Sequence, residues 1–388
     1  MRVAAAILIG LLGTLSSLGQ TPQKVKLSDF KLASSCQPCH QEIYAQWQTS
    51  THSKAFVDPL YQAVVRKAVE ESKGGLTQFC VSCHAPLATV TSSIPRDLFQ
   101  QEQKDPRIEN GVTCEFCHTI SGKEVNLNKV SLGAFLFPRA IQTKILYGRH
   151  ADATNDAHPT QPSPFLLSAE LCGTCHRFGH PVSGMPVQDT YQEWKQSPYA
   201  AQGTRCQDCH MPSYQGKVSE SGKERSEIHA HIFRGGHTEM IRQAAIVNIT
   251  ANRASTNTLD ASVIVTNVGA GHMIPTGLPA VREMWLEVTV QSQGKILSTQ
   301  KRIFGLEVLN AEGKPALPWE ATKLGKDTRI APKKSRLEKF RFEVSGSENI
   351  RIEAKLQEQL LSDQAAKFAG IPPTPPQTMA ETSISLPQ

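Results

Sequence analysis

The sequence predicts two domains of different class: an N-terminal domain of short helices and loops, followed by an all-β sandwich. Two patterns lead to this prediction. Ten cysteines fall at regular spacing between residues 36 and 209, and beyond about residue 243 the apolar residues change from helical spacing to an alternation with period two. A short apolar run precedes both patterns. We therefore expect a leader over 1–19, the first domain over 20–243 and the β domain over 244–388.

The leader is predicted from the first 19 residues. Arg2 is followed by an apolar run over 3–12, and Ser17 and Gly19 fit the small residues of a cleavage site. The run is too short to span a bilayer and is typical of a secretory signal peptide. No later segment is apolar for long enough to cross a membrane. We therefore expect export to the periplasm or the outside of the cell, with no membrane span.

The cysteines carry the chemistry of the first domain. They form five Cys-x-x-Cys pairs, each followed at once by His, and these pairs use all ten cysteines. No cysteine is left for a disulfide scaffold or a nucleophilic thiol. The five units are Cys36/Cys39 with His40, Cys80/Cys83 with His84, Cys114/Cys117 with His118, Cys172/Cys175 with His176, and Cys206/Cys209 with His210.

This spacing is the one required for c-type haem attachment. Cysteines at i and i+3 share a helical face, and the His at i+4 lies beside them, so two thioether bonds and one iron ligand fit a single turn. Zinc sites would need pairs of such units to share a metal, and five units cannot pair off. A thioredoxin-like motif would occur once. The sequence therefore predicts five covalently attached haem c groups, with His40, His84, His118, His176 and His210 as the proximal iron ligands.

Haem at this density changes the interpretation of both fold and charge. Five haems within residues 36–210 would supply most of the core, so we expect a multihaem cytochrome c domain that is mostly α-helix and loop. The formal charge of +6 is offset by about ten haem propionates and the ferric irons, which brings the oxidised protein close to neutral. The basic sequence therefore gives no indication of nucleic-acid binding.

Eight further histidines are available for the sixth coordination positions. The distal candidates are His52, His158, His231, His237 and His272. We place His52 on a helical run and His272 on a Gly- and Pro-bounded loop that reaches from the β domain into the haem domain. Whether His150 is a ligand remains an open question, and one of His229 and His231 is redundant if both point the same way. His180 follows His176 by four residues, on the proximal side of that haem, so it cannot be that haem's distal ligand. Met185, Met211, Met240 and Met273 are competing ligands, and Met raises the potential relative to His.

A partial internal repeat points to one unusual haem. Tyr44-x-x-Trp47-x-x-Ser50-x-His52 aligns with Tyr191-x-x-Trp194-x-x-Ser197-x-Tyr199. The second copy has Tyr where the first has a candidate ligand. This difference suggests that one haem has lost a ligand there.

Alternating apolar residues predict the C-terminal domain. Met284–Val290, Phe340–Val344 and Ile350–Leu356 alternate with polar residues, and Ala245–Ala251 and Ser262–Val268 do so more weakly. About seven such strands suggest a sandwich of immunoglobulin-like type. The final segment, 382–386, is either an edge strand or a tail.

Three motifs resemble the multihaem cytochrome c superfamily, the group that contains hydroxylamine oxidoreductase, its tetrahaem partner cytochrome and pentahaem nitrite reductase. They are residues 111–118 (Gly-Val-Thr-Cys-Glu-Phe-Cys-His), Trp47-x-x-Ser50-x-His52 and 206–212 (Cys-Gln-Asp-Cys-His-Met-Pro). The resemblance covers about 36–240, and the loop 271–277 resembles a C-terminal module of some members. It implies closely stacked, mostly bis-His haems that conduct electrons. All five motifs end in His, whereas pentahaem nitrite reductase has a Cys-x-x-Cys-Lys at its catalytic haem, which lowers that alternative.

These observations predict an exported pentahaem electron carrier rather than an enzyme. Its partners would be redox proteins: other cytochromes, a quinol-linked donor or a terminal reductase. One alternative is an oxidoreductase of small nitrogen or sulfur compounds that works at one five-coordinate haem. Another is an oligomer in which neighbouring subunits exchange ligands and form a haem filament.

Overall fold

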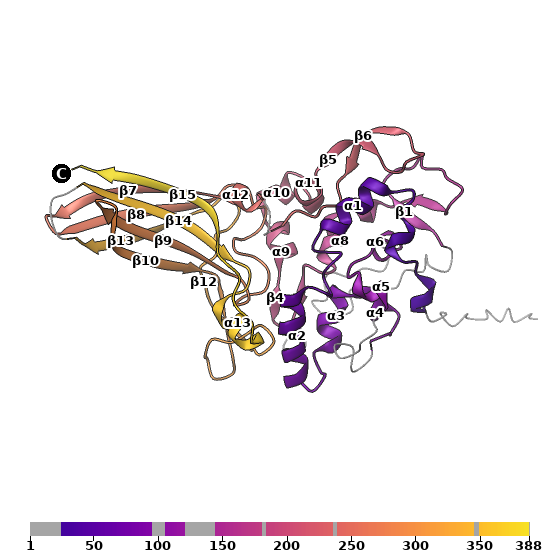
Figure 1. The fold of residues 1–388 in the computed structure, drawn as a ribbon, viewed down its shortest axis with the longest axis horizontal. Coiled ribbons are helices and arrows are strands. Elements are labelled where there is room, and N and C mark those ends of the chain that lie inside the picture. Colours follow the sequence, from indigo (N-terminus) through magenta and orange to yellow (C-terminus); the bar gives the residue numbers. More distant parts are fainter. Residues whose placement is uncertain are drawn as a thin grey trace, which may run out of the picture.

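The computed structural model describes residues 25–94, 105–120, 144–180, 184–235, 239–344 and 349–387. The expected signal peptide and His237 lie outside these residues. Among the described residues, no helix combines the length and the apolar character needed to cross a bilayer. Helices and short strands form one part of the molecule, and long antiparallel strands form the other (Figure 1).

The helical part consists of short elements joined by loops, as predicted. Its helices are α1 (Gln41–Thr49), α2 (Pro59–Glu71), α3 (Thr77–His84), α4 (Pro86–Val90), α5 (Pro106–Glu109), α6 (Cys114–His118), α8 (Ala169–Gly173), α9 (Thr190–Lys195), α10 (Pro198–Ala201), α11 (Cys206–His210) and α12 (Ile241–Ala244). Short two-stranded ladders pair β1 (Leu146–Gly148) with β2 (Thr160–Pro162), β3 (Phe178–Gly179) with β4 (Pro186–Gln188), and β5 (Ser213–Lys217) with β6 (Glu224–His229). Turns of 3-10 helix cover Leu27–Asp29, Ala33–Ser35 and Pro164–Leu167.

Local sequence explains where these helices begin and end. The Asp58 carboxylate accepts a hydrogen bond from the backbone N–H of Tyr61 at 2.9 Å, and Pro59 occupies the first turn of α2. Helix α1 ends at Thr49 because Ser50 is extended and bonds back to the Trp47 carbonyl. His52 therefore lies in a turn after α1, and the prediction that it sits on the helical run was wrong.

Apolar packing in the helical part is divided into small clusters. One contains Phe56, Val65 and Val81, and another contains Phe30, Leu87 and Phe116. By contrast, the strands enclose a single large cluster. The small clusters agree with a domain in which protein side chains supply only part of the core.

The strands form two antiparallel sheets and a hairpin. One sheet has the order β13-β8-β7 and the other β10-β9-β14-β15, while β11 pairs with β12. The bounds are β7 (Ala245–Ser255), β8 (Thr258–Asn267), β9 (Glu283–Ser292), β10 (Lys295–Phe304), β11 (Leu306–Leu309), β12 (Lys323–Asp327), β13 (Ser335–Glu343), β14 (Ile350–Gln359) and β15 (Gln377–Leu386). The C-terminal segment is thus an edge strand paired with β14 rather than a tail.

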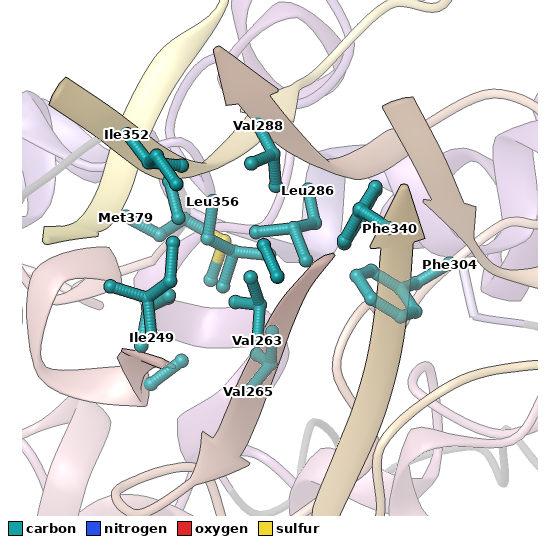
Figure 2. Packing of buried hydrophobic residues seen from close by; sticks show 14 of the residues in the cluster. Ile249, Val263, Val265, Leu286, Val288, Phe304, Phe340, Ile352, Leu356 and Met379 are labelled. Atoms are coloured by element: carbon teal, nitrogen blue, oxygen red, sulfur yellow. The ribbon is translucent and has the colours of Figure 1, made fainter. Parts of the chain in front are cut away.

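The two sheets bury one face each against the other. Val263 and Val265 from one sheet and Leu286 and Val288 from the other are fully buried, and Figure 2 shows these side chains converging between the strands. The alternation seen in the sequence puts these residues on one face of each strand. The two-layer all-β prediction is confirmed at this level.

A separate apolar cluster joins the two parts. Val64 of α2 packs with Ala365 of α13 (Asp363–Ala369) and with Leu361, which precedes that helix. The two helices lie next to each other in Figure 1. The His180 imidazole also contacts the β part, since its Nε2 lies 2.9 Å from the Trp319 carbonyl oxygen. His180 is therefore a buried histidine that joins the two parts.

Candidate haem-binding sites

Each of the five Cys-x-x-Cys-His units lies on a single helical turn. The units starting at Cys80, Cys114 and Cys206 lie within α3, α6 and α11. In the other two, the His40 N–H donates to the Cys36 carbonyl and the His176 N–H to the Cys172 carbonyl, each at 2.9 Å. Both cysteines and the histidine of each unit are thereby presented on one side of the turn, as covalent haem attachment requires.

The cysteines of different units lie against one another. The side chain of Cys36 lies beside that of Cys114, Cys83 beside Cys175, and Cys172 beside Cys206. The first unit is therefore next to the third, the second next to the fourth, and the fourth next to the fifth. Cys39 and Cys209, in the first and last units, are the exposed cysteines of the ten.

Burial favours the neutral form of two of the thiols, Cys80 and Cys117. Burial raises the pKa of Cys80 and of Cys117 to about 12. Among the described residues, no group of three or more His, Cys, Asp or Glu side chains converges as a metal-ion site would need. Paired cysteines with a neighbouring His instead fit the thioether and iron bonds of haem c.

Four of the five proximal histidines face a second histidine at nearly the same separation. The ring centroids lie 6.4 Å apart for His40 and His158, 6.4 Å for His52 and His176, 6.2 Å for His118 and His231, and 6.4 Å for His210 and His272. Two imidazoles that bind one metal from opposite sides, each through a nitrogen at about 2.0 Å, have centroids roughly 6 Å apart. The separations therefore match those of two axial ligands on one iron.

Hydrogen bonds to the other ring nitrogen orient most of these imidazoles. Nδ1 lies within hydrogen-bond distance of a backbone carbonyl oxygen in His40 (Val218, 2.5 Å), His84 (Ala55, 2.7 Å), His118 (Tyr147, 2.6 Å), His231 (His229, 2.9 Å), His272 (Met273, 2.9 Å) and His210 (Arg234). A proton on Nδ1 leaves Nε2 with a free lone pair, which is the tautomer that a metal requires. His158 Nδ1 contacts the Thr160 hydroxyl at 3.1 Å, and His176 Nδ1 lies 3.3 Å from the Gln188 amide.

Burial favours the neutral form of His52, His176, His231 and His272. Desolvation lowers the pKa of His52 to about 3, and that of His176, His231 and His272 to about 4. Neighbouring histidines lower the pKa of each further. Neutral imidazole is the form that coordinates a metal.

His84 has a different environment from the other proximal histidines. Its ring stacks on the Tyr61 ring, with centroids 3.8 Å apart and planes 12° apart. Among the described residues, no imidazole faces it at the separation seen in the other four sites. The Tyr61 hydroxyl is buried and has no hydrogen-bond partner in the described part of the chain.

The unusual haem expected at the Tyr199 position stays a prediction, and among the described residues the site that differs from the others is that of His84. Tyr199, which replaces a candidate ligand in the internal repeat, donates a hydrogen bond to the Val268 carbonyl at 2.8 Å. The nearby His210 has an opposing imidazole, supplied by His272 from the β part. Both copies of the repeat use their Trp in the same way: Trp47 Nε1 donates to the Val112 carbonyl and Trp194 Nε1 to the Thr204 carbonyl. The repeat therefore reflects helix packing, and the site without a described histidine partner is that of His84.

His150 and His229 are not paired with a proximal histidine. His229 Nδ1 lies 2.8 Å from the Met211 carbonyl, and the Nε2 atoms of both residues are buried without a described partner. His229 is the last residue of β6, and His231, two residues further along, is the histidine whose ring faces His118.

Comparisons with known proteins show that the fold is similar to that of a multihaem cytochrome. The family model described as cytochrome c554 and c-prime matches residues 35–119, which contain the first three motifs. The crystal structure of a penta-heme cytochrome c552 from Thermochromatium tepidum is similar over nearly the whole molecule: it is 24% identical, covers 94% of this chain and 99% of its own, and has a TM-score of 0.67.

The other similar structures match too little of the fold to indicate a class of protein. A CARDB domain from Pyrococcus furiosus covers 29% of this chain and 67% of its own at 14% identity, with a TM-score of 0.18. No curated protein matches the chain. The matches support a multihaem c-type cytochrome, and the resemblance to hydroxylamine oxidoreductase and nitrite reductase stays a prediction.

Proposed function

We propose that this protein is an exported pentahaem c-type cytochrome that transfers single electrons between redox proteins. The observation that carries the proposal is the set of four histidine pairs with ring separations of 6.2–6.4 Å, each formed by one motif histidine and one distant histidine. Haem c, when bound, supplies reversible one-electron chemistry at iron. His158, His52, His231 and His272 would be the distal ligands opposite His40, His176, His118 and His210.

The chain's own residues would hold the haems close together and fix their ligation. The contacts between cysteines of different units support stacked haems, because each cysteine is an attachment point. Carbonyl oxygens that accept from Nδ1 orient the imidazoles and increase their basicity as ligands. The exposed Cys39 and Cys209 mark the first and fifth sites as the places where partner proteins would exchange electrons.

The fold of the β part supports an immunoglobulin-like sandwich. With the hairpin β11–β12 left aside, β7, β8 and β13 correspond to strands A, B and E in one sheet. In the other sheet, β10, β9, β14 and β15 correspond to strands C′, C, F and G. This division matches the sheets of immunoglobulin-like domains apart from the strand at one edge. We propose that the part from residue 244 onward is a domain of this type, which would contribute His272 to the fifth site.

Mass spectrometry and spectroscopy of the purified mature protein test the main proposal. We expect added mass equal to five haems, an N-terminus near Gln20, and low-spin signals from four bis-His centres in the oxidised protein. An unmodified polypeptide, or fewer than five haems, would contradict it. Alanine variants of the four distal histidines should each convert one haem to a high-spin form.

A reductase or oxidase acting at the second haem is a second candidate function, favoured by the environment of His84. An open iron position there would bind small ligands such as nitric oxide or cyanide. Titrating the oxidised protein with cyanide should reveal one binding site per chain. His237 lies outside the described residues, so the H237A variant is the matched comparison. If cyanide binds only to H237A and not to the natural protein, His237 is the missing ligand and the carrier function stands alone.

A further inference from the structure

The loop that carries His272 is held firmly within the β part. It connects β8 to β9, and the side-chain amide of Asn267, a fully buried residue, donates to the His272 carbonyl at 2.9 Å. Ile274 and Ile330 exchange two backbone hydrogen bonds, at 3.0 and 2.9 Å. The loop is therefore anchored at His272 itself and two residues beyond it.

The same loop is also fastened to the haem-binding part, through one carboxylate. Glu193 of α9 accepts hydrogen bonds from the Thr276 hydroxyl at 2.7 Å and from the Met273 N–H at 3.3 Å. Its second oxygen pairs with the guanidinium of Arg329, a residue next to Ile330. The side chains of Glu193 and Arg329 are only 7% and 13% exposed. A second contact joins the hydroxyls of Thr190 and Thr276 at 2.7 Å.

The location of this carboxylate indicates a positioning role. A buried ion pair is weak evidence for stability, because desolvating both charges offsets much of their attraction. Such a pair fixes geometry when both partners are fully hydrogen-bonded, and Arg329 also bonds Asp327 at 2.8 Å. Here one bond to the Glu193 carboxylate comes from Met273, the residue immediately after His272, and another from Thr276 in the same loop.

We propose that Glu193 is a positioning residue that holds the β-part loop so that the His272 imidazole stays opposite His210. The inference rests on the proposed function, in which these two histidines bind one haem iron. Glu193 itself touches neither imidazole and acts through Met273, Thr276 and Arg329. The sixth ligand of the fifth haem thus depends on a contact between the two parts of the chain.

Spectroscopy of the oxidised holoprotein tests this role with four variants. H272A should convert one haem in five to a high-spin form that added imidazole returns to low spin. E193A should produce the same high-spin signal in part, and E193Q a smaller amount, because glutamine keeps the acceptor oxygen but loses the charge. The control is D260N, which neutralises one partner of the exposed ion pair between Asp260 and Arg341 in the β part. It should leave the spectrum unchanged.

The results separate the inference from the proposed function. If H272A has the natural spectrum, the assignment of His272 as a ligand fails. If H272A changes but E193A and E193Q keep the natural spectrum and the natural haem potentials, the positioning role is overturned, even if their melting temperatures fall. Should E193A fail to fold, E193Q and T276V still decide, since each removes only part of the network.

Discussion

Replacing Gly111 by alanine should displace His52, the proposed distal ligand opposite His176, because the new Cβ would clash with the His52 backbone. Gly111 has φ +62°, and a Cβ built there would lie 2.5 Å from the His52 carbonyl oxygen and 3.0 Å from the Ala55 nitrogen. The neighbouring Val112 N–H donates to that same His52 carbonyl at 3.0 Å, so the two segments are tightly apposed.

Two effects determine how strongly the Gly111→Ala substitution disturbs His52. An L-residue in the left-handed region costs about 1–2 kcal/mol. In addition, ordinary contact begins near 3.4 Å, so the His52 backbone must retreat by the difference between 3.4 and 2.5 Å, which is 0.9 Å. Such a shift is nearly half the length of a metal–nitrogen bond, which is about 2.0 Å. We therefore expect loss of the pairing between His52 and His176 in a large fraction of molecules.

The assay is the high-spin signal of oxidised G111A, measured beside G203A. Gly203 also has a positive φ, +78°, but no atom lies within 4 Å of its Cβ position. G203A should therefore lose stability without changing the spectrum, whereas G111A should convert up to one haem in five to high spin. If the two variants have the same spectrum, the steric reasoning is refuted.

Three further predictions follow from other contacts. H158A should convert one haem to a high-spin form detected by electron paramagnetic resonance, whereas H150A should not, because only His158 faces a proximal histidine; equal spectra would contradict the pairing. L361A should lower the free energy of unfolding by about 2–5 kcal/mol in denaturant titrations, since Leu361 is 2% exposed in the cluster joining α2 to α13, and a change under 1 kcal/mol would argue against that packing. The hydrogen bonds from Arg107 lower the pKa of Asp105, so this carboxylate stabilises the fold above its unfolded pKa of about 3.8 and the benefit is lost as pH falls through the lower folded value. D105N should therefore be less stable than the natural protein at neutral pH, with the difference shrinking in acid; a difference independent of pH would refute this.

Sequence reasoning succeeded where the chemistry is local. The spacing of two cysteines and a histidine requires only one helical turn, and all five turns form where the motifs lie. The β alternation is equally local, because burial on one face follows directly from period two. Strand β14 illustrates this: Ile352 and Leu356 are buried while Arg351 is exposed.

The histidine pairs depend on contacts that no local pattern reports. His40 faces His158 and His210 faces His272, and the residues between them fold into several separate elements. The sequence identified His158 and His272 as candidates because surplus histidines in a haem-dense chain are otherwise hard to explain, but it did not identify their partners. The distinct environment of His84 was also not predicted, since the repeat directed attention to Tyr199.

Glu193 was missed for the same reason. One Glu in a helix of six residues is unremarkable until Arg329 and Thr276 come from the β part to meet it. Only the arrangement of α9 against the loop brings these groups together.

The supply of His272 by the β part has a consequence for the order in which the protein matures. Translation delivers the N-terminus first, so the turn with Cys206, Cys209 and His210 emerges before the strands that follow. In the proposed arrangement, the fifth iron would keep an open coordination position until β8 and β9 have folded. A prematurely terminated product would then differ visibly in colour and ligand affinity from the finished molecule, which makes this haem an internal reporter of complete synthesis.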